Sequence, residues 1–319
     1  MNNPRVSILM SIFNERLDWI SECINSIINQ SFPDFELIII NDNPSRDEID
    51  SLIDKFIDDR IVYYKNHKNM GLALSMNKAA SLAKGIYFAR MDADDICEPD
   101  RILLEYNILN TNLYDFVFSN FSFINENSEL IKKNNNEYFT PNEVTKIINL
   151  RQIINHSTVM FRKDLFEKVG GYRNFICAQD YDLWLRLNEN NCRFYMINDT
   201  LIKYRVNSSG LSHRLWYTQR LSIFYIFYLS LQRCRTGHDD YSYNHYLNFL
   251  NKFHHNSIYY KTRLLKSMDL ISKSVLSTNK LTAAYYLFLS LLKSKALRFH
   301  FKNYIFKKFY MIKKEIKYI

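Results

Sequence analysis

VSILMSIFNERLDWISECINSII, residues 6–28, joins two different hydrophobic patterns in one short stretch. Val6 to Ile12 is a nearly continuous apolar run of strand length, whereas the apolar residues from Leu17 to Ile28 recur every three or four positions, as on one face of a helix. A buried strand that leads directly into a helix is typical of a parallel sheet covered on both faces. The stretch therefore predicts the first unit of an α/β fold.

The same alternation continues along the next part of the chain. Apolar runs of strand length lie at 35–40, 61–64, 86–91 and 157–161, and helical patterns lie at 47–57, 71–83, 163–169 and from Asp180 onward. Gly170 and Gly171 mark the end of the helix at 163–169. Because strands that alternate with helices form right-handed βαβ units, we expect an α/β fold with a Rossmann-like, mostly parallel central sheet flanked by helices.

The composition describes a globular chain with a large core. It has 319 residues, of which 47% are hydrophobic, and its five cysteines are scattered without a CxxC pair, so neither a disulfide framework nor a zinc cage is expected. The apolar start at 6–12 lacks the basic flank and cleavage site of a signal peptide, and the longest later apolar run, 283–292, is about half of a membrane span. These features favour a cytoplasmic setting without a transmembrane helix.

Positive charge is concentrated at the C-terminal end. The formal net charge is +9, and the residues from Lys293 to Ile319 hold nine Lys or Arg against a single Glu. After Trp216 the sequence changes to long helical patterns that are rich in Tyr and Phe. We therefore expect a domain at 1–217 and a helical, aromatic and basic region at 218–319.

Residues 293–319 have the pattern of a basic amphipathic helix. The apolar positions recur every three or four residues at Leu297, Phe301, Ile305, Phe309, Ile312 and Ile316, and lysines, including Lys307, fall on the flanks and the far side. Such a helix suits an anionic membrane surface, but it also suits its own domain or a second copy of the chain in a homo-oligomer. Nucleic acid is not an expected partner, because the rest of the chain is nearly neutral and no groove-reading motif occurs.

Polar residues follow three of the predicted strands. They are Ser11 to Glu15 after the first strand, Asn41 and Asp42 after the second, and Asp92 to Asp95 after the fourth. In a parallel sheet, ligands bind beyond the carboxyl ends of the strands, so one pocket can hold all three groups. Two aspartates separated by one residue suit Mg²⁺ or Mn²⁺ together with phosphate oxygens. The alternative is a solvated turn in which Asp95 caps the following helix.

Five segments together resemble a known family. In order and spacing, the segments VSILMSIFNE (6–15), FELIIINDN (35–43), NMGLALSMNKAASLAKGIYFARMDADD (69–95), HSTVMFRKDLFEKVGGY (156–172) and QDYDLWLRL (179–187) resemble the inverting family 2 glycosyltransferases, such as those that build bacterial capsule and lipopolysaccharide glycans. The resemblance covers about residues 4–212. It implies the GT-A fold, with the C-terminal helical region as an extension.

The resemblance assigns roles on the nucleotide-sugar side. Asp42 matches the aspartate that binds the uracil of a UDP-sugar, and its alternative is a helix N-terminal cap. The first-strand positions Ser11, Phe13 and Glu15 match the nucleotide pocket, although Phe13 suits the core equally well. Asp92 and Ala93 match positions near the ribose and the sugar, and Asp94 matches the ligand of a Mn²⁺ or Mg²⁺ ion on the diphosphate. Arg90 is placed either on phosphate or in a pair with a neighbouring aspartate.

The resemblance also assigns the acceptor side. Asp180 matches the catalytic base, with Asp182 as its rival and a solvent-facing helix position as the alternative for Asp182. His156 is placed in the acceptor pocket, or else as a buried, hydrogen-bonded histidine. Trp184 is expected in the core.

Two positions depart from the family pattern. Gln179 stands where the family usually has Glu, which leaves the base without one supporting charge. YRVNSSGLS at 204–212 has Asn207 where His is common, so a third metal ligand does not follow from the pattern, and His213 is a substitute for it.

These assignments predict a metal-dependent, inverting, non-processive glycosyltransferase that moves a sugar from a nucleotide sugar, with UDP favoured, to a hydroxyl of a glycan acceptor in surface polysaccharide or lipopolysaccharide synthesis. An acceptor on a lipid anchor agrees with a peripheral position at the inner face of the cell membrane through residues 293–319. The alternative is a catalytically degenerate GT-A domain that serves binding or assembly. A DxD hydrolase carries its motif after the first strand, a nucleotidyltransferase needs a glycine-rich loop that SIFNERLDW lacks, and a processive synthase carries a QxxRW segment.

Overall fold

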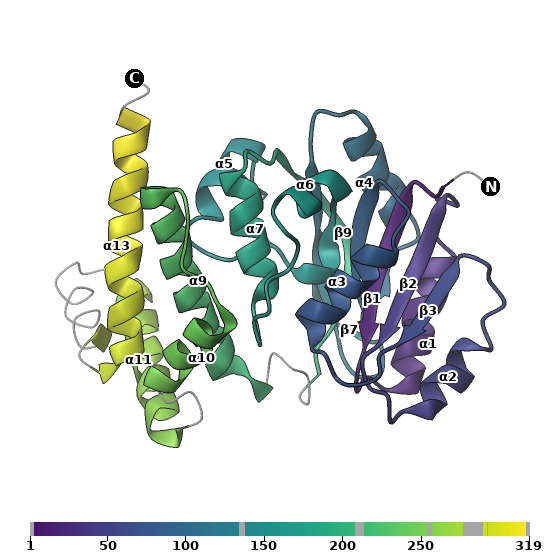
Figure 1. Cartoon of the computed structure of the whole chain (residues 1–319), viewed down its shortest axis with the longest axis horizontal. Helices are drawn as coiled ribbons and strands as arrows, with labels where there is room; N and C mark the ends of the chain where they lie inside the picture. The colour runs from purple at the N-terminus through teal and green to yellow at the C-terminus, as the bar shows by residue number, and fades with distance from the viewer. Residues whose placement is uncertain are drawn as a thin grey trace. The chain divides into compact units, whose positions relative to one another are not determined.

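The computed structural model describes residues 3–133, 138–207, 214–253, 257–276, 290–291 and 293–316. The chain divides into two compact units, of which the first comprises Met1–Asn174 with Gln179–Gly210 and the second Phe175–Ala178 with Leu211–Ile319 (Figure 1). The boundary expected at residue 217 lies beyond this division, inside the helix α9 that begins at Trp216.

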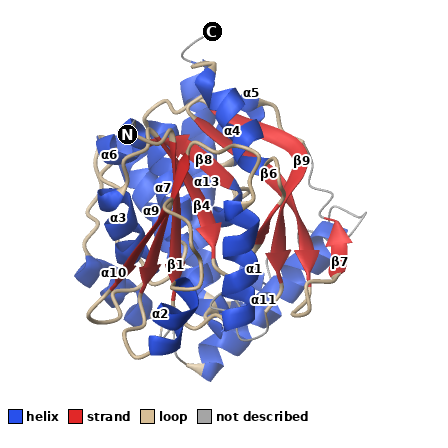
Figure 2. Cartoon of the chain, turned by 90° about the vertical axis from the view of Figure 1, so that its right-hand side faces the viewer, coloured by secondary structure: helices blue, strands red, loops and turns tan. Residues whose placement is uncertain are grey.

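A single mixed sheet organises the described part of the first unit (Figure 2). Its order is β3-β2-β1-β4-β8-β6-β9-β5, and β7 pairs with β6. The strands are β1 Val6–Ile12, β2 Phe35–Asn41, β3 Ile61–Lys65, β4 Tyr87–Asp92, β5 Ile96–Cys97, β6 Phe116–Ile124, β7 Leu130–Lys133, β8 Val159–Arg162 and β9 Phe194–Arg205. Strands β1 to β4 are parallel, as the sequence predicted, whereas β8 runs antiparallel to both of its neighbours, β4 and β6.

Helices cover both faces of this sheet. They are α1 Leu17–Ile28, α2 Asp47–Ile53, α3 Leu72–Leu82, α4 Arg101–Asn110, α5 Pro141–Ile147, α6 Lys163–Lys168 and α7 Gln179–Glu189, with a 3-10 turn, η1, at His156–Thr158. On one face, Ile8 and Met10 of β1 share a core with Ile20 and Ile24 of α1. On the other face, the ring of Phe88 in β4 meets Phe166 of α6 edge to face. The predicted α/β class is therefore confirmed.

The second helix ends earlier than the sequence pattern predicted. The pattern placed its end at Ile57, but α2 ends at Ile53, and Ile57 is 99% exposed. Between Ile53 and β3 only Phe56 still packs against the core, and the side chain of Arg60 pairs with Asp58 before β3 begins. The predicted end of α6 is confirmed, because Gly170 and Gly171 both have positive φ angles after it.

Helices make up the described part of the second unit. They are α9 Trp216–Thr236, α10 Tyr243–Lys252, α11 Ile258–Leu276 and α13 Lys295–Ile316. Aromatic side chains fill its core, where Tyr225 of α9 lies against Tyr246 and Phe249 of α10. Among the described residues, no helix is both long enough and apolar enough to cross a membrane.

Helix α13 packs on α9 with a face that differs from the predicted apolar stripe (Figure 1). Leu297 is buried as expected, but Ile305 is 36% exposed and Lys307 is fully buried. The amine of Lys307 donates to the hydroxyl of Ser230 at 2.7 Å and lies 4.7 Å from the ring centre of Phe227. The prediction for Lys307 was wrong because a hydroxyl and an aromatic face on α9 together receive its charge. The side chains of the stripe beyond Lys307 lie outside the described residues.

Candidate active site

The parallel strands bring polar side chains together at their carboxyl ends. Ser11 of β1 and Asp92 of β4 are register partners, so their side chains project from the same face of the sheet. Arg90 lies two positions before Asp92 and therefore shares that face. Asp42 directly follows β2. The site edge that the sequence predicted from the strand ends is thus present.

Asp92 is held ionised by its neighbours. Arg90 pairs with its Oδ1, and the hydroxyl of Ser157 in η1 donates to its Oδ2 at 2.7 Å. Burial opposes the ionisation of Asp92, but Arg90, with a smaller contribution from the Ser157 hydroxyl, lowers its pKa below the usual value. Arg90 therefore forms the aspartate pair that the sequence allowed. Its Nε and Nη1 are buried and have no hydrogen-bond partner among the described residues.

Asp94 has the opposite environment. Burial and the nearby carboxylates of Asp92 and Glu15 raise its pKa to about 7. The pKa of Glu15 is raised as well, chiefly by burial, although the backbone N–H of Phe13 donates to Glu15 Oε2 at 2.6 Å. Negative charge is thus crowded and only partly offset here.

This crowding fits a hard divalent cation, since carboxylate oxygens are the ligands that Mg²⁺ and Mn²⁺ prefer. No group of three or more His, Cys, Asp or Glu side chains that could hold a metal occurs among the described residues. A cation beside Asp94 would therefore complete its coordination with water and ligand oxygens, as Mg²⁺ commonly does.

Two residues that the sequence analysis did not single out support the aspartates. Ser157 contacts Asp95 as well as Asp92, so one hydroxyl joins both carboxylates. Arg205, the last residue of β9, donates from its backbone N–H to Asp95 Oδ1 at 2.9 Å and from Nε to the carbonyl of Asp94 at 2.7 Å. Asp95 is fully buried, and burial raises its pKa well above the usual value. The alternative in which Asp95 lies in a solvated turn is therefore wrong.

Asp180 lies at the start of α7 and is only 8% exposed. Gln152 Nε2 donates to its Oδ2 at 2.9 Å. Burial raises the pKa of Asp180 to about 6, while the backbone N–H of Tyr181 acts in the opposite direction. This value leaves Asp180 mostly ionised at neutral pH yet able to take up a proton.

Asp182, the rival base, is fully buried and bound to another side chain. Its Oδ2 accepts from Arg186 Nε at 2.8 Å, and Arg186 also donates to the carbonyl of Gly171 at 2.7 Å. The alternative of a solvent-facing position for Asp182 is therefore wrong. Trp184 is fully buried against the rings of Phe116 and Phe161, as the sequence predicted.

Asp42 accepts hydrogen bonds from the residues that immediately precede α3. Its Oδ1 accepts from the side chain of Asn66 and from the backbone N–H of Met70, both at 2.8 Å, and its Oδ2 accepts from the backbone N–H of Gly71 at 2.8 Å. The carboxylate thus organises the residues that precede α3, but the N-cap residues of α2 and α3 are Arg46 and Gly71, so the alternative of Asp42 as a helix cap is wrong. One acceptor position on Oδ2 remains beyond these three contacts.

The remaining predicted residues differ in exposure. Phe13 is 37% exposed, so its placement in the core is wrong, while Ser11 and Ala93 are buried. His156 is buried and its Nε2 lies 2.8 Å from the hydroxyl of Tyr172, which matches the buried, hydrogen-bonded alternative. Burial, together with Arg90, lowers the pKa of His156 to about 3. Residues 208–213, including His213, lie outside the described residues.

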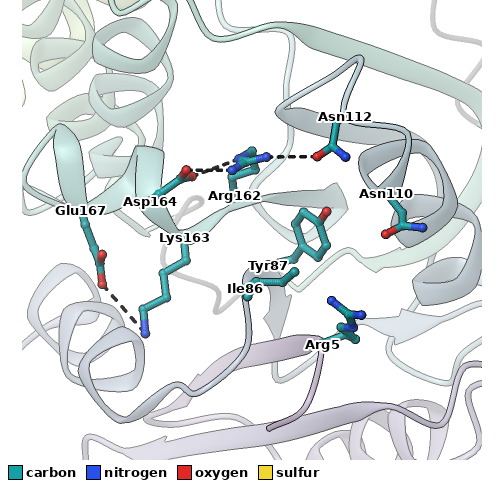
Figure 3. A pocket seen from close by; sticks show the side chains of 9 residues that line it. All are labelled: Arg5, Ile86, Tyr87, Asn110, Asn112, Arg162, Lys163, Asp164 and Glu167. Atoms are coloured by element: carbon teal, nitrogen blue, oxygen red, sulfur yellow. Dashed lines mark hydrogen bonds and ion pairs between the residues drawn. The ribbon is translucent and has the colours of Figure 1, made fainter.

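A separate cavity of about 430 Å³ lies at the opposite edge of the sheet (Figure 3). It is lined near the start of β1 by Arg5, near the start of β4 by Tyr87, and at the end of β8 by Arg162. The charged groups there are largely paired with one another, as Arg162 is with Asp164. None of the predicted site residues lines this cavity.

Comparison with known proteins gives a family match. The family model described as glycosyl transferase family 2 matches residues 7–170, which includes Asp42, Asp92 and Asp94. Asp180 and Arg205 lie beyond the matched segment.

Individual relatives agree with this match. An uncharacterized glycosyltransferase of Methanocaldococcus jannaschii is 34% identical over 209 residues, which cover 65% of this chain and 72% of the relative. The O-antigen biosynthesis glycosyltransferase WbnJ of Escherichia coli is 34% identical over 210 residues, or 64% of this chain and 81% of WbnJ.

A solved structure shares the fold. The crystal structure of S. aureus TarS 1–349 in complex with UDP-GlcNAc matches with a TM-score of 0.58 at 16% identity, over 96% of this chain and 91% of that one. The match to a longer TarS chain covers 54% of it. At this level of identity the likeness concerns the GT-A fold with its C-terminal helical part.

Proposed function

This chain belongs to glycosyl transferase family 2, and from that premise we propose that it transfers a sugar from a UDP-sugar to a hydroxyl of a glycan acceptor, with inversion at the anomeric carbon and without processivity. The observation that carries the proposal is the contrast between three carboxylates, two at the carboxyl end of β4 and one at the start of α7. Asp92 has a lowered pKa, whereas burial raises the pKa values of Asp94 and Asp180 to about 7 and about 6. Carboxylates whose environments separate their pKa values suit different roles in one reaction.

On the nucleotide side, Asp94 would hold the cation, with Asp92 beside the ribose and sugar. Mn²⁺ or Mg²⁺ bound there would offset the negative charge of the leaving diphosphate. Ser11, Phe13 and Glu15 would line the base pocket, in which the exposed ring of Phe13 offers a stacking surface. Asp42 would accept the N–H of the pyrimidine on the remaining acceptor position of Oδ2.

On the acceptor side, Asp180 would act as general base. Its carboxylate would take the proton of the acceptor hydroxyl while that oxygen forms a bond to the anomeric carbon. The bond from the anomeric carbon to the diphosphate oxygen breaks on the opposite face, and UDP leaves with the electron pair. The burial of Asp180 supports this role, because it raises the pKa of the carboxyl to about 6, close enough to neutral pH for the group both to accept and to release a proton.

The choice of UDP and of a surface glycan is supported by relatives. TarS 1–349 was crystallised with UDP-GlcNAc, and WbnJ is named as an enzyme of O-antigen biosynthesis. We extend the same substrate classes to this chain.

The exposed face of α13 supports a peripheral position on an anionic membrane. Among the side chains of α13 that the structure describes, the exposed ones are Lys295, Arg298, Lys302 and Ile305, which lie at helical spacing. Cationic side chains beside an apolar one suit an anionic lipid surface. Full-length protein should sediment with phosphatidylglycerol vesicles but not with phosphatidylcholine vesicles, and K295E/K302E should abolish this. Unchanged sedimentation of that variant, or salt-independent self-association alone, would favour a homo-oligomer instead.

Calorimetric titration of UDP tests the donor site. We expect binding with Mn²⁺ present, strong weakening with EDTA, and the same weakening in Asp94→Ala. Asp180→Asn should bind UDP normally but release no UDP from a UDP-sugar. Binding of GDP or dTDP in place of UDP would change the donor class. If the wild-type protein binds no UDP under any of these conditions, the proposed transfer from a UDP-sugar is wrong.

A further inference from the structure

Asp180 receives a side-chain hydrogen bond from a distant segment. Gln152 lies between α5 and η1, and its Nε2 donates to Asp180 Oδ2 at 2.9 Å across 28 positions of sequence. Within the described part of the chain, no other side chain donates a hydrogen bond to this carboxylate. The contact therefore selects one of the two carboxylate oxygens.

The chemistry of an amide restricts what this contact can do. The NH₂ group of glutamine donates only, and the amide does not titrate, so Gln152 neither removes nor supplies the proton of the reaction. A hydrogen bond to a carboxylate stabilises its charged form. Gln152 thus acts against burial, which raises the pKa of Asp180 to about 6.

The other groups around Asp180 act in different ways. Arg90 and Asp92 of β4 act on it through their charges, and the backbone N–H of Tyr181, in the same turn of α7, also stabilises its charged form. Tyr172, after α6, stays neutral at the pH of the reaction because burial raises its pKa. The hydroxyl of Tyr172 is already hydrogen-bonded to His156.

The segment that carries Gln152 also fixes the nucleotide side of the site. Five residues later, Ser157 donates to Asp92 Oδ2 at 2.7 Å, and His156 between them holds Tyr172. One short segment therefore contacts Asp180 near its start and Asp92 at its end.

We propose that Gln152 is a positioning residue for Asp180, which holds Oδ2 and leaves Oδ1 to take the proton of the acceptor hydroxyl. This inference rests on the role proposed above for Asp180 as general base. In this role Gln152 acts through Asp180 and not on the reacting atoms. Its substitution is expected to change the rate and the pH dependence of the reaction more than the affinity for substrate.

The test compares four variants of the full chain by the release of UDP from a UDP-sugar, with water as the acceptor until the glycan is known. Gln152→Ala should lower kcat about tenfold with KM nearly unchanged, and should move the acid limb of the kcat/KM profile up by about one pH unit. Gln152→Glu places a second carboxylate against Asp180, so its loss should be larger at pH 6 and should diminish toward pH 9. Asn149→Ala is the matched control, because Asn149 lies in the same connection and its amide donates to the carbonyl of Thr145 at 2.7 Å.

Asp180→Asn separates this inference from the proposed function. If Asp180→Asn is inactive while Gln152→Ala and Gln152→Glu keep the rate and pH profile of Asn149→Ala, the positioning role is wrong and the role of the base stands. If Asp180→Asn remains active, both fail. A UDP affinity equal to that of wild type in each variant shows that the fold is intact. If Gln152→Ala instead lowers the UDP affinity and leaves the pH profile unshifted, Gln152 has a structural role only, and the positioning role is wrong.

Discussion

Replacing Arg205 by Met should destabilise the first unit strongly, because one buried guanidinium joins three segments. Nη1 donates to the carbonyl of Asn125 and the hydroxyl of Ser128, both at 3.0 Å, and Nε donates to the carbonyl of Asp94 at 2.7 Å. Nη2 donates to Glu22 at 2.6 Å. The variant keeps much of the apolar stem and removes every one of these donors.

The loss of unfolding free energy depends on which hydrogen-bond partners of Arg205 can be rehydrated once the guanidinium is removed. The side chain of Glu22 is 45% exposed and rehydrates when the guanidinium is removed, so its ion pair contributes about 0–1 kcal/mol. The acceptors on Asn125, Ser128 and Asp94 each cost about 1 kcal/mol when they are left unsatisfied. We therefore expect the free energy of unfolding to fall by about 3–4 kcal/mol, with Arg205→Lys intermediate because an amine cannot reach three separate acceptors.

Urea unfolding followed by tryptophan fluorescence measures this change, since the guanidinium lies 5.1 Å from the ring centre of Trp19 and that ring reports on the first unit. A loss below about 1 kcal/mol, or an Arg205→Lys variant as stable as wild type, would refute the view that the fork geometry of Arg205 holds the aspartate turn. Because Asp94 sits on that turn, the Met variant should also bind UDP more weakly in the presence of Mn²⁺.

Three further results are expected. Gly85→Ala should lower the free energy of unfolding by about 2–3 kcal/mol in urea titrations, because a Cβ there would lie 2.7 Å from the backbone nitrogen of Ser7, and equal stability would contradict the close approach. The pKa of His156 is lowered to about 3 by burial and by Arg90, so between pH 6.5 and 3 the unfolded chain binds one more proton at this residue. The contribution of His156 to the free energy of unfolding should therefore fall by about 1.4 kcal/mol per pH unit as the pH drops. His156→Gln should reduce this slope, which urea unfolding at about pH 7 and about pH 5 measures. The pKa of Asp94 is raised to about 7, so protons should compete with Mn²⁺ below that pH; thermal stabilisation by Mn²⁺ should be larger at pH 8 than at pH 6 and should vanish with EDTA, and a pH-independent stabilisation would exclude Asp94 as the ligand.

The periodic hydrophobic patterns of the sequence predicted most of the strands and helices of the first unit. The strands β1, β2 and β4 are buried on both faces, so their apolar runs were visible in the sequence, and the helices between them showed the period of a covered face. The position of Asp42 and Asp92 then followed from the rule that ligands bind at the carboxyl ends of parallel strands. Local patterns determine such features, because each depends on residues within one βα unit.

The residues that support the site could not be found in this way. Gln152 stands in no motif, Ser157 lies in a family segment that assigns it no role, and Arg205 reaches the aspartates only because β9 pairs with β5 and β6. These contacts join positions that are 28 to 111 residues apart. The burial of Lys307 has the same origin, because its partner Ser230 belongs to another helix. Only the tertiary pairing reveals such neighbours.

The opposite pKa shifts of Asp92 and Asp94 show how one turn acquires two kinds of carboxylate. Both are half-buried, but Asp92 has Arg90 and the hydroxyl of Ser157, whereas Asp94 faces the negative charges of Asp92 and Glu15. The donors that stabilise Asp92 thereby keep a negative charge beside Asp94, which prevents Asp94 from ionising freely in the absence of a further positive charge. The arrangement costs stability at the turn, which the cation proposed for Asp94 would recover. The sequence motif supplies the aspartates, and the residues behind it determine that Asp94, and not Asp92, is the candidate ligand.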